Sequence, residues 1–261
     1  MYLKNITNII FVLFLIPSIS FAAKPENLRI SNVRGNCLTV SWTSVTLEIG
    51  KVKYGTNISN YNKWTVAFDD RGANIIDDIH HISLKNIYSN TTYFFELVSG
   101  DSVDNNNGEY YQVNSGPVLS PVGGSCMPAG KIFKNKDKTQ LAYDTIVYVI
   151  IIGESENTNS ACESVLVTQE SNGYWFVELV NFRTKDYNNY YSYSCSSSKI
   201  KVEAQAGNDG FASMLTNVVD YNEKEMPDII VIPQDLFMDV NKDGSLGLEE
   251  AIFILQKLSK H

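Results

Sequence analysis

The chain has 261 residues and a formal net charge of −8, with 29 Asp and Glu against 21 Lys and Arg. A nucleic-acid backbone attracts basic surfaces, so this acidic balance argues against a nucleic acid as partner. A chain of this length has room for one or two domains.

The first 22 residues have the pattern of a secretory signal peptide. Lys4 supplies a positive charge, an apolar run follows at 9–16, and the stretch 20–22 places small residues where a signal peptidase reads them. The run is shorter than the ~20 apolar residues that a membrane helix needs, although an uncleaved anchor is the alternative. We expect a mature chain from Ala23 without a membrane span. It would be secreted or lie at the cell surface, with the periplasm as the alternative compartment.

Four cysteines remain after removal of the signal: Cys37, Cys126, Cys162 and Cys195. An even number of cysteines in an exported chain favours disulfides, and four of them allow three connectivities. No Cys/His spacing typical of zinc accompanies them. All four are therefore disulfide candidates, with free thiols as the alternative.

From residue 24 to about 116 the chain alternates in polarity over short segments separated by turn residues. Leu38, Val40 and Trp42 alternate with polar residues, as in a half-buried strand. Further strands are expected at 51–54, 82–84, 93–98 and 110–113. A series of about seven short strands with such turns indicates a β-sandwich.

Several of these residues resemble a fibronectin type III domain. The resemblance lies in Leu38-x-Val40-x-Trp42, in the sequence VKYGT at 52–56, and in NTTY at 90–93. Tyr93 falls where that family places its tyrosine corner, whose hydroxyl bonds to backbone a few residues upstream. The segments 54–56 and 78–81 are similar to the variant that precedes purple acid phosphatase catalytic domains, but no such catalytic region follows. The fold hosts many roles, so the resemblance implies an architecture and no activity.

A second β-rich block follows a linker. Proline, glycine and serine gather at 117–125, and we place the linker at 119–127, between a first domain at 23–118 and a second at 128–233. Strands are expected at 145–152, 164–169, 174–179, 200–204 and 229–232. The sequences at 145–149, 172–175 and 202–205 resemble carboxypeptidase regulatory-type, prealbumin-like modules. The predicted fold class is therefore mainly β, with two sandwich modules.

The fibronectin type III resemblance also favours one disulfide pairing. In that topology Cys37 opens the second strand at the pole where the last strand ends, and Cys126 lies just past that strand. The resemblance thus implies a Cys37–Cys126 bond, which leaves Cys162 and Cys195 to join two loops of the second module.

The most specific motif is DVNKDGSLGLEE at 239–250, which has the spacing of an EF-hand calcium loop. Ca²⁺ needs six to eight oxygen ligands, and Gly244 permits the sharp turn between them. The expected ligands are Asp239, Asn241, Asp243, the Ser245 carbonyl and bidentate Glu250. An acidic turn that caps a helix is the alternative, although it does not explain the glycine or the spacing.

The loop opens a tail, 234–261, that continues as an amphipathic helix. Leu248, Ala251, Ile252, Leu255 and Leu258 share one face. The loop and helix resemble one half of a dockerin repeat, and the missing second copy weakens any expectation of cohesin binding. The helix is either a docking surface or a segment that calcium holds against the second sandwich.

The sequence contains no motif of a catalytic nucleophile, and we predict that the protein is not an enzyme. Of the paired histidines His80 and His81, we expect one to point inward and the other to solvent. A tyrosine-rich loop carries possible ligand-binding residues, with packing at the sandwich edge as the alternative. These residues are Tyr187, Tyr190, Tyr191 and Tyr193.

The combined prediction is an exported, calcium-binding modular protein for adhesion, scaffolding or partner docking. Its partner would be an extracellular or cell-surface protein, or a polysaccharide. The alternative function is a carbohydrate-binding module, or accessory domains of a secreted hydrolase system.

Overall fold

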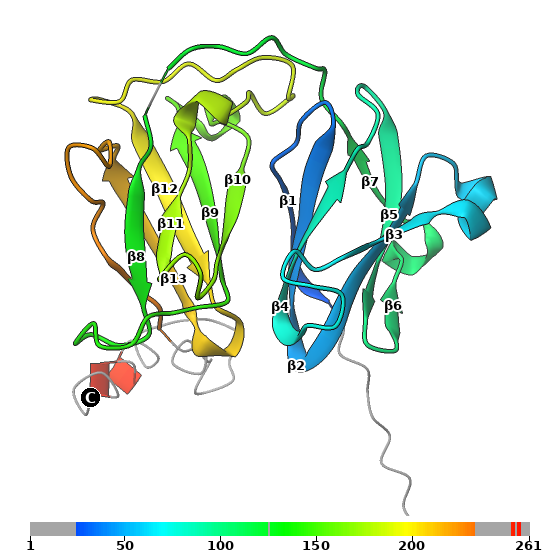
Figure 1. The fold of residues 1–261 in the computed structure, drawn as a ribbon, viewed down its shortest axis with the longest axis horizontal. Coiled ribbons are helices and arrows are strands. Elements are labelled where there is room, and N and C mark those ends of the chain that lie inside the picture. Colours follow the sequence, from blue (N-terminus) through cyan, green and yellow to red (C-terminus); the bar gives the residue numbers. More distant parts are fainter. Residues whose placement is uncertain (1–24, 125, 233–251, 254, 257–261) are drawn as a thin grey trace, which may run out of the picture.

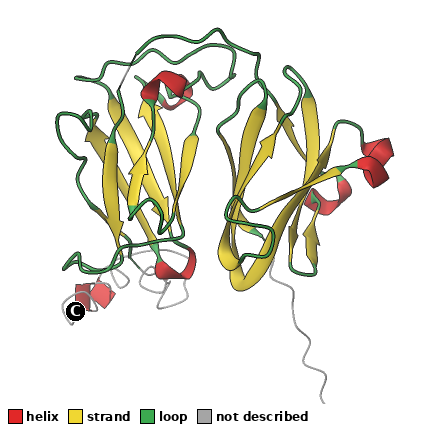
Figure 2. Cartoon of the chain, viewed as in Figure 1, coloured by secondary structure: helices red, strands yellow, loops and turns green. Residues whose placement is uncertain are grey.

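The computed structural model describes residues 25–124, 126–232, 252–253 and 255–256, and it shows two β-rich units side by side (Figure 1). Strands dominate, and the helices of residues 25–232 are short 3₁₀ segments (Figure 2). The predicted mainly β fold class is confirmed. Within the described residues no helix has the length and apolar character needed to cross a membrane. The predicted calcium loop 239–250 and the predicted signal peptide 1–22 lie outside the described residues.

The first unit contains seven strands and two 3₁₀ turns. Its elements are β1 (Glu26–Ser31), β2 (Cys37–Gly55), η1 (Ile58–Lys63), β3 (Thr65–Phe68), β4 (Ile76–Lys85), β5 (Thr92–Ser99), β6 (Ser102–Asp104), η2 (Asn106–Gly108) and β7 (Tyr111–Asn114). The long strand β2 belongs to two layers, because its first half pairs with β1 and β4 and its second half pairs with β3 and β5. The register shifts between Thr43 and Glu48, where β2 passes from one layer to the other. The sequence predicted two separate strands here.

The core of this unit is apolar, and the expected alternation accounts for it. Leu38, Val40 and Trp42 are fully buried, together with Phe95 and Leu97 of β5. The predicted tyrosine corner is present, since the Tyr93 hydroxyl accepts a hydrogen bond from the Tyr88 backbone N–H at 2.7 Å. This contact and the seven-stranded arrangement give the first unit a fibronectin type III-like architecture.

The second unit contains two sheets of four and three strands. Its elements are β8 (Ala129–Phe133), β9 (Thr145–Ile152), η3 (Glu156–Thr158), β10 (Glu163–Val167), β11 (Tyr174–Phe176), η4 (Leu179–Asn181), β12 (Lys199–Gln205), η5 (Gly207–Asp209), β13 (Phe211–Asn217) and β14 (Ile229–Ile230). The sheet orders are β10-β9-β12-β13 and β11-β8-β14. Trp175, Phe182 and Ile132 are among the fully buried residues of its core. Strands β8 and β13 were not predicted, and β11 ends earlier than expected because the chain turns into η4.

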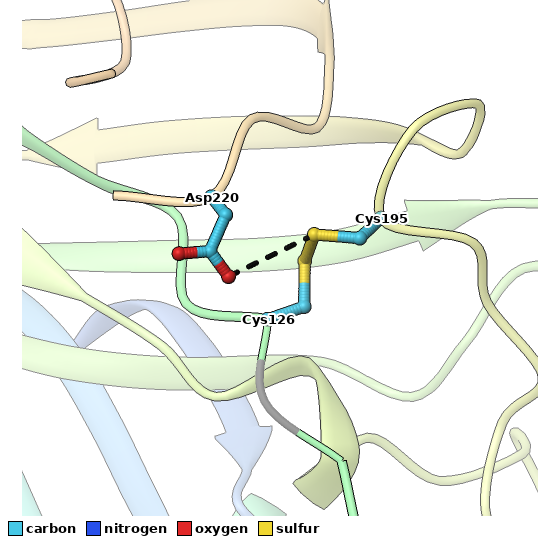
Figure 3. A group of neighbouring side chains, drawn as sticks. All are labelled: Cys126, Cys195 and Asp220. Atoms are coloured by element: carbon cyan, nitrogen blue, oxygen red, sulfur yellow. Dashed lines mark hydrogen bonds between the residues drawn. A yellow bond between two sulfur atoms is a disulfide. The ribbon is translucent and has the colours of Figure 1, made fainter. Parts of the chain in front are cut away.

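The one disulfide among the described cysteines joins Cys126 to Cys195, so the pairing that the resemblance implied is wrong (Figure 3). Cys126 is buried in the core of the second unit, and its carbonyl accepts a hydrogen bond from the Leu179 N–H at 3.0 Å. It is therefore anchored away from Cys37. Cys37 and Cys162 are free thiols, and burial raises the pKa of both, that of Cys162 to about 12.

Candidate functional site at the junction of the two units

The two units meet along a surface that we call the junction, where residues 29–34, 41 and 69–81 of the first unit contact 144–166, 203 and 208 of the second. A small apolar cluster lies within it, formed by Ile79, Ile146 and Tyr148. Most of the remaining contacts are polar. Buried polar groups are costly unless they are paired, so these contacts fix one arrangement of the two units.

Arg34 forms the strongest of these contacts. Its two terminal nitrogens donate to the two carboxylate oxygens of Glu163, both at 2.6 Å. This is the parallel bidentate geometry in which an arginine binds a carboxylate most tightly. Burial raises the pKa of the Glu163 carboxyl, and the Arg34 guanidinium opposes that rise. Removing either partner would leave a charge buried without its counter-ion.

A second ion pair across the junction involves Arg29 of β1. Arg29 donates to Glu203 at 2.5 Å, and its guanidinium lies 4.4 Å from the centre of the Tyr148 ring. Burial raises the pKa of the Tyr148 hydroxyl to about 12. The Tyr148 hydroxyl is 2.8 Å from Ser41 Oγ, which adds a buried bond between the units.

Ser164 of β10 is the centre of a hydrogen-bond network across the junction. Its Oγ lies 2.6 Å from Ser31 Oγ, accepts from Asn32 Nδ2 at 3.0 Å, and is 2.9 Å from His81 Nε2. His81 Nδ1 in turn bonds to Asp70 at 2.8 Å. The order carboxylate, imidazole, hydroxyl is that of a nucleophilic triad.

The surroundings of Ser164 indicate that the hydrogen-bond chain from Asp70 through His81 to Ser164 has a structural role. Ser164 is 9% exposed, and both Ser31 and His81 are buried around it. An acylation site needs an accessible nucleophile and donors aimed at an oxyanion, whereas the Ser164 hydroxyl is occupied by three side chains of the first unit. The network therefore joins the two units. Sequence inspection missed it because Ser164 lies 83 residues from His81 and carries no motif.

The paired histidines are both buried, which corrects the expectation that one would face solvent. His80 lies in the first unit, with its ring 4.8 Å from that of Trp42, while His81 points into the junction. Both belong to β4, and the second face of β4 is covered by the second unit. A single sandwich seen in isolation would have exposed that face.

Next to His81, Asp69 and Asp70 bring a cluster of charges to the rim of the junction. Arg71 donates to Asp69 at 2.9 Å and also pairs with Asp77 and Asp144. Burial opposes ionisation of both Asp69 and Asp70, but hydrogen bonds from the neighbouring histidines, Arg71 and Ser83 hold the pKa of each carboxyl below its usual range.

Three side chains of the tyrosine-rich loop pack against the cores, and the fourth, Tyr190, lines a hollow. Tyr187 packs against the core of the first unit, whereas Tyr191 and Tyr193 pack against that of the second. The Tyr191 hydroxyl also donates to the Thr158 carbonyl at 2.7 Å. Tyr190 differs, because it lines a hollow of about 290 Å³ at the top of the junction.

That hollow is bounded by the first unit, the linker and the second unit. Its lining includes Arg34, Asn36, Val118, Asn181, Arg183 and Tyr190. Arg183 is held from behind, since its Nη1 donates to the carbonyls of Pro117 at 2.9 Å and Tyr187 at 3.1 Å. Gly116 allows this approach, because a Cβ there would lie 2.6 Å from Arg183 Nη1. Neither Arg34 nor Arg183 was predicted as a site residue.

Two other places in the described chain could suggest a binding site. Cys126, Cys195 and Asp220 have ligand atoms within 4.8 Å of one another (Figure 3). The two sulfurs are joined in a disulfide, however, and metal binding requires thiolates. A second hollow of about 300 Å³ lies beside η1, where Trp64 and Tyr54 contribute to its lining.

Comparison with known proteins gives only distant matches. No protein-family model and no curated protein sequence matches this chain. The chicken CNTN1 FN1–FN3 domains share 13% identity at a TM-score of 0.27, over 75% of this chain and 65% of that one. A two-domain fibronectin type III segment from chicken tenascin shares 13% identity at a TM-score of 0.26, over 74% and 99%. The chain thus spans 65% of the length of the CNTN1 structure. At these scores neither match bears on activity or partner.

Proposed function

We propose that this protein is an exported, non-catalytic, calcium-binding protein that docks an extracellular or cell-surface protein through its C-terminal segment. The observation that carries the proposal is the exposure of Ile252 and Leu255, at 45% and 66%, in the segment that follows the calcium-loop sequence 239–250. Apolar side chains exposed on a helix are typical of a surface that a partner covers.

The contacts of the junction support a scaffolding function in addition to docking. Two modules on a free linker would present a partner in many orientations, whereas the Arg34–Glu163 pair and the Ser164 network restrict the first unit relative to the second. A fixed pair of units suits a protein that presents its C-terminal segment at a defined position. Because the Ser164 hydroxyl is occupied by junction contacts, a catalytic role has less support.

The test combines calcium binding with partner capture. In residues 23–261, Glu250→Gln removes a bidentate ligand and should weaken Ca²⁺ binding in calorimetry by tenfold or more, given a loss of about 1.5–3 kcal/mol. Leu255→Asp should abolish a capture from the source cell envelope that wild type shows in Ca²⁺ but not in EDTA. Leu215→Asp is the matched control, because Leu215 is 63% exposed on β13 and lies outside the tail. Capture that survives both EDTA and Leu255→Asp contradicts the docking role.

A carbohydrate-binding role, alone or as accessory domains of a secreted hydrolase system, is the second candidate function. Three of the four tyrosines proposed for it are engaged in packing or hydrogen bonds. Tyr190 alone lines a hollow, and this position is the observation that keeps a polysaccharide among the possible partners.

A further inference from the structure

The hollow at the top of the junction contains a buried cation, Arg183, that Glu163 attracts although the carboxylate of Glu163 is paired with Arg34. Arg183 is 3% exposed, and within the described ranges no carboxylate forms a hydrogen bond or ion pair with it. Its Nε is buried and has no hydrogen-bond partner among the described residues. Buried donors in folded proteins are almost always satisfied by protein, water or a ligand, so this orphan donor indicates a missing partner.

The charges around the hollow favour an anion as that partner. Arg34 also lines it, and its charge is compensated by Glu163. Arg183 therefore leaves a net positive charge at the hollow, in a chain whose overall charge is −8. Burial, followed by repulsion from Arg34, lowers the pKa of the Arg183 guanidinium. An anion in the hollow would relieve both effects.

We propose that this hollow binds the carboxylate of an acidic sugar, a hexuronate residue. Arg183 binds the carboxylate, because a guanidinium with a free Nε–H pairs with a carboxylate in a charge-assisted geometry. The ring of Tyr190, whose centre is 6.0 Å from the Arg183 guanidinium carbon, offers a flat face for the sugar ring. This inference deepens the second candidate function, and the docking role of the C-terminal segment does not depend on it.

The rest of the lining suits the hydroxyls of a sugar ring. Asn36 and Asn181 line the hollow from the two units, and each amide both donates and accepts hydrogen bonds. The hydroxyls of a sugar ring can use both capacities. The single uncompensated guanidinium also matches one carboxylate per sugar residue.

The test is a calorimetric titration of residues 23–261 with glucuronate, with glucose as the uncharged control and N-acetylglutamate as the non-sugar carboxylate. Glucuronate should bind at least about tenfold tighter than glucose, because a charged hydrogen bond contributes about 1.5–3 kcal/mol. It should also bind tighter than N-acetylglutamate, and added salt should weaken it. Equal affinities for glucuronate and glucose, no binding of either, or tighter binding of N-acetylglutamate would overturn the proposal.

Variants separate the hollow from the rest of the surface. Asn36→Asp places a carboxylate in the hollow at an exposed position and should weaken glucuronate several-fold. Asn60→Asp makes the same change at an exposed position within η1 and should leave binding as in wild type. Leu255→Asp should also bind glucuronate normally, which keeps this test independent of the docking role. Equal losses in the two asparagine variants contradict the assignment.

Discussion

Two arginines line the same hollow and have opposite surroundings, and Arg34 is half-buried whereas Arg183 is buried. Arg34 binds both oxygens of Glu163 at 2.6 Å, whereas Arg183 donates only to backbone carbonyls and keeps an unpartnered Nε. Burial opposes the charge of both, but the pKa of Arg34 is raised by Glu163 and that of Arg183 is lowered. The same residue type thus joins the two units at one position and, in our proposal, binds a ligand at the other.

The difference teaches where to look for binding in a β-sandwich protein whose sequence carries no catalytic motif. An arginine that is paired with a carboxylate in the junction is explained by that ion pair, and it requires no ligand. A charge that the structure buries without compensation costs stability, so its presence calls for another explanation. We therefore assign Arg34 to the junction and Arg183 to binding.

The largest effect should follow removal of the carboxylate from the paired arginine. Glu163→Gln leaves Arg34 buried without a counter-ion, and we expect a loss of about 3–5 kcal/mol in the free energy of unfolding, measured in urea. The matched control is Glu203→Gln, which breaks the pair with the more exposed Arg29 and should cost only about 1 kcal/mol. Equal costs would mean that burial does not set the importance of these pairs.

The second-largest effect should follow removal of the Cys126–Cys195 disulfide, which lies away from the junction contacts. Replacing Cys126 and Cys195 together by serine opens a link between residues 69 apart, and we expect a loss of about 2–4 kcal/mol. Amide hydrogen exchange should show the loss in β8 to β14, with β1 to β7 less affected. Glu163→Gln should instead weaken the strands that border the junction in both units. An identical exchange pattern for the two variants would argue against a distinct junction.

The smallest effect at neutral pH concerns the rim of the junction. The pKa of Asp70 is lowered in the folded state, so its contribution to stability is present above the unfolded value of about 3.9 and is lost as the pH falls through the folded value. Asp70→Asn should therefore flatten the loss of stability below about pH 4. Asp101→Asn, at an exposed position, should keep the wild-type profile in a pH series of thermal unfolding. A wild-type profile for Asp70→Asn would remove Asp70 from the acid response.

Much of the fold could be predicted from local sequence pattern. Alternating apolar residues such as Leu38, Val40 and Trp42 identify the buried faces of strands, and β9 has the predicted bounds Thr145–Ile152. The tyrosine corner at Tyr93 followed from the fibronectin type III resemblance. These features depend on neighbours close in sequence, or on a topology shared by many proteins.

The junction could not be predicted, because its contacts join residues that are 73–174 positions apart and carry no periodic signal. Arg34 and Glu163 are ordinary polar residues in the sequence, and so are Ser31 and Ser164. Only the packing of the two units buries them. The disulfide could not be predicted for the same reason. Cys126 is buried in the core of the second unit, and this position depends on the path of the linker rather than on local sequence.

The most direct test of the central claim is a pair of double-mutant cycles that share Glu163→Gln. One cycle combines it with Arg34→Met and the other with Arg183→Met, and the free energy of unfolding is measured for each variant. We predict a coupling of about 2–3 kcal/mol for Arg34 and Glu163, and below about 0.5 kcal/mol for Arg183 and Glu163. Equal couplings would show that Glu163 compensates both arginines, which would contradict the division between a structural and a binding arginine.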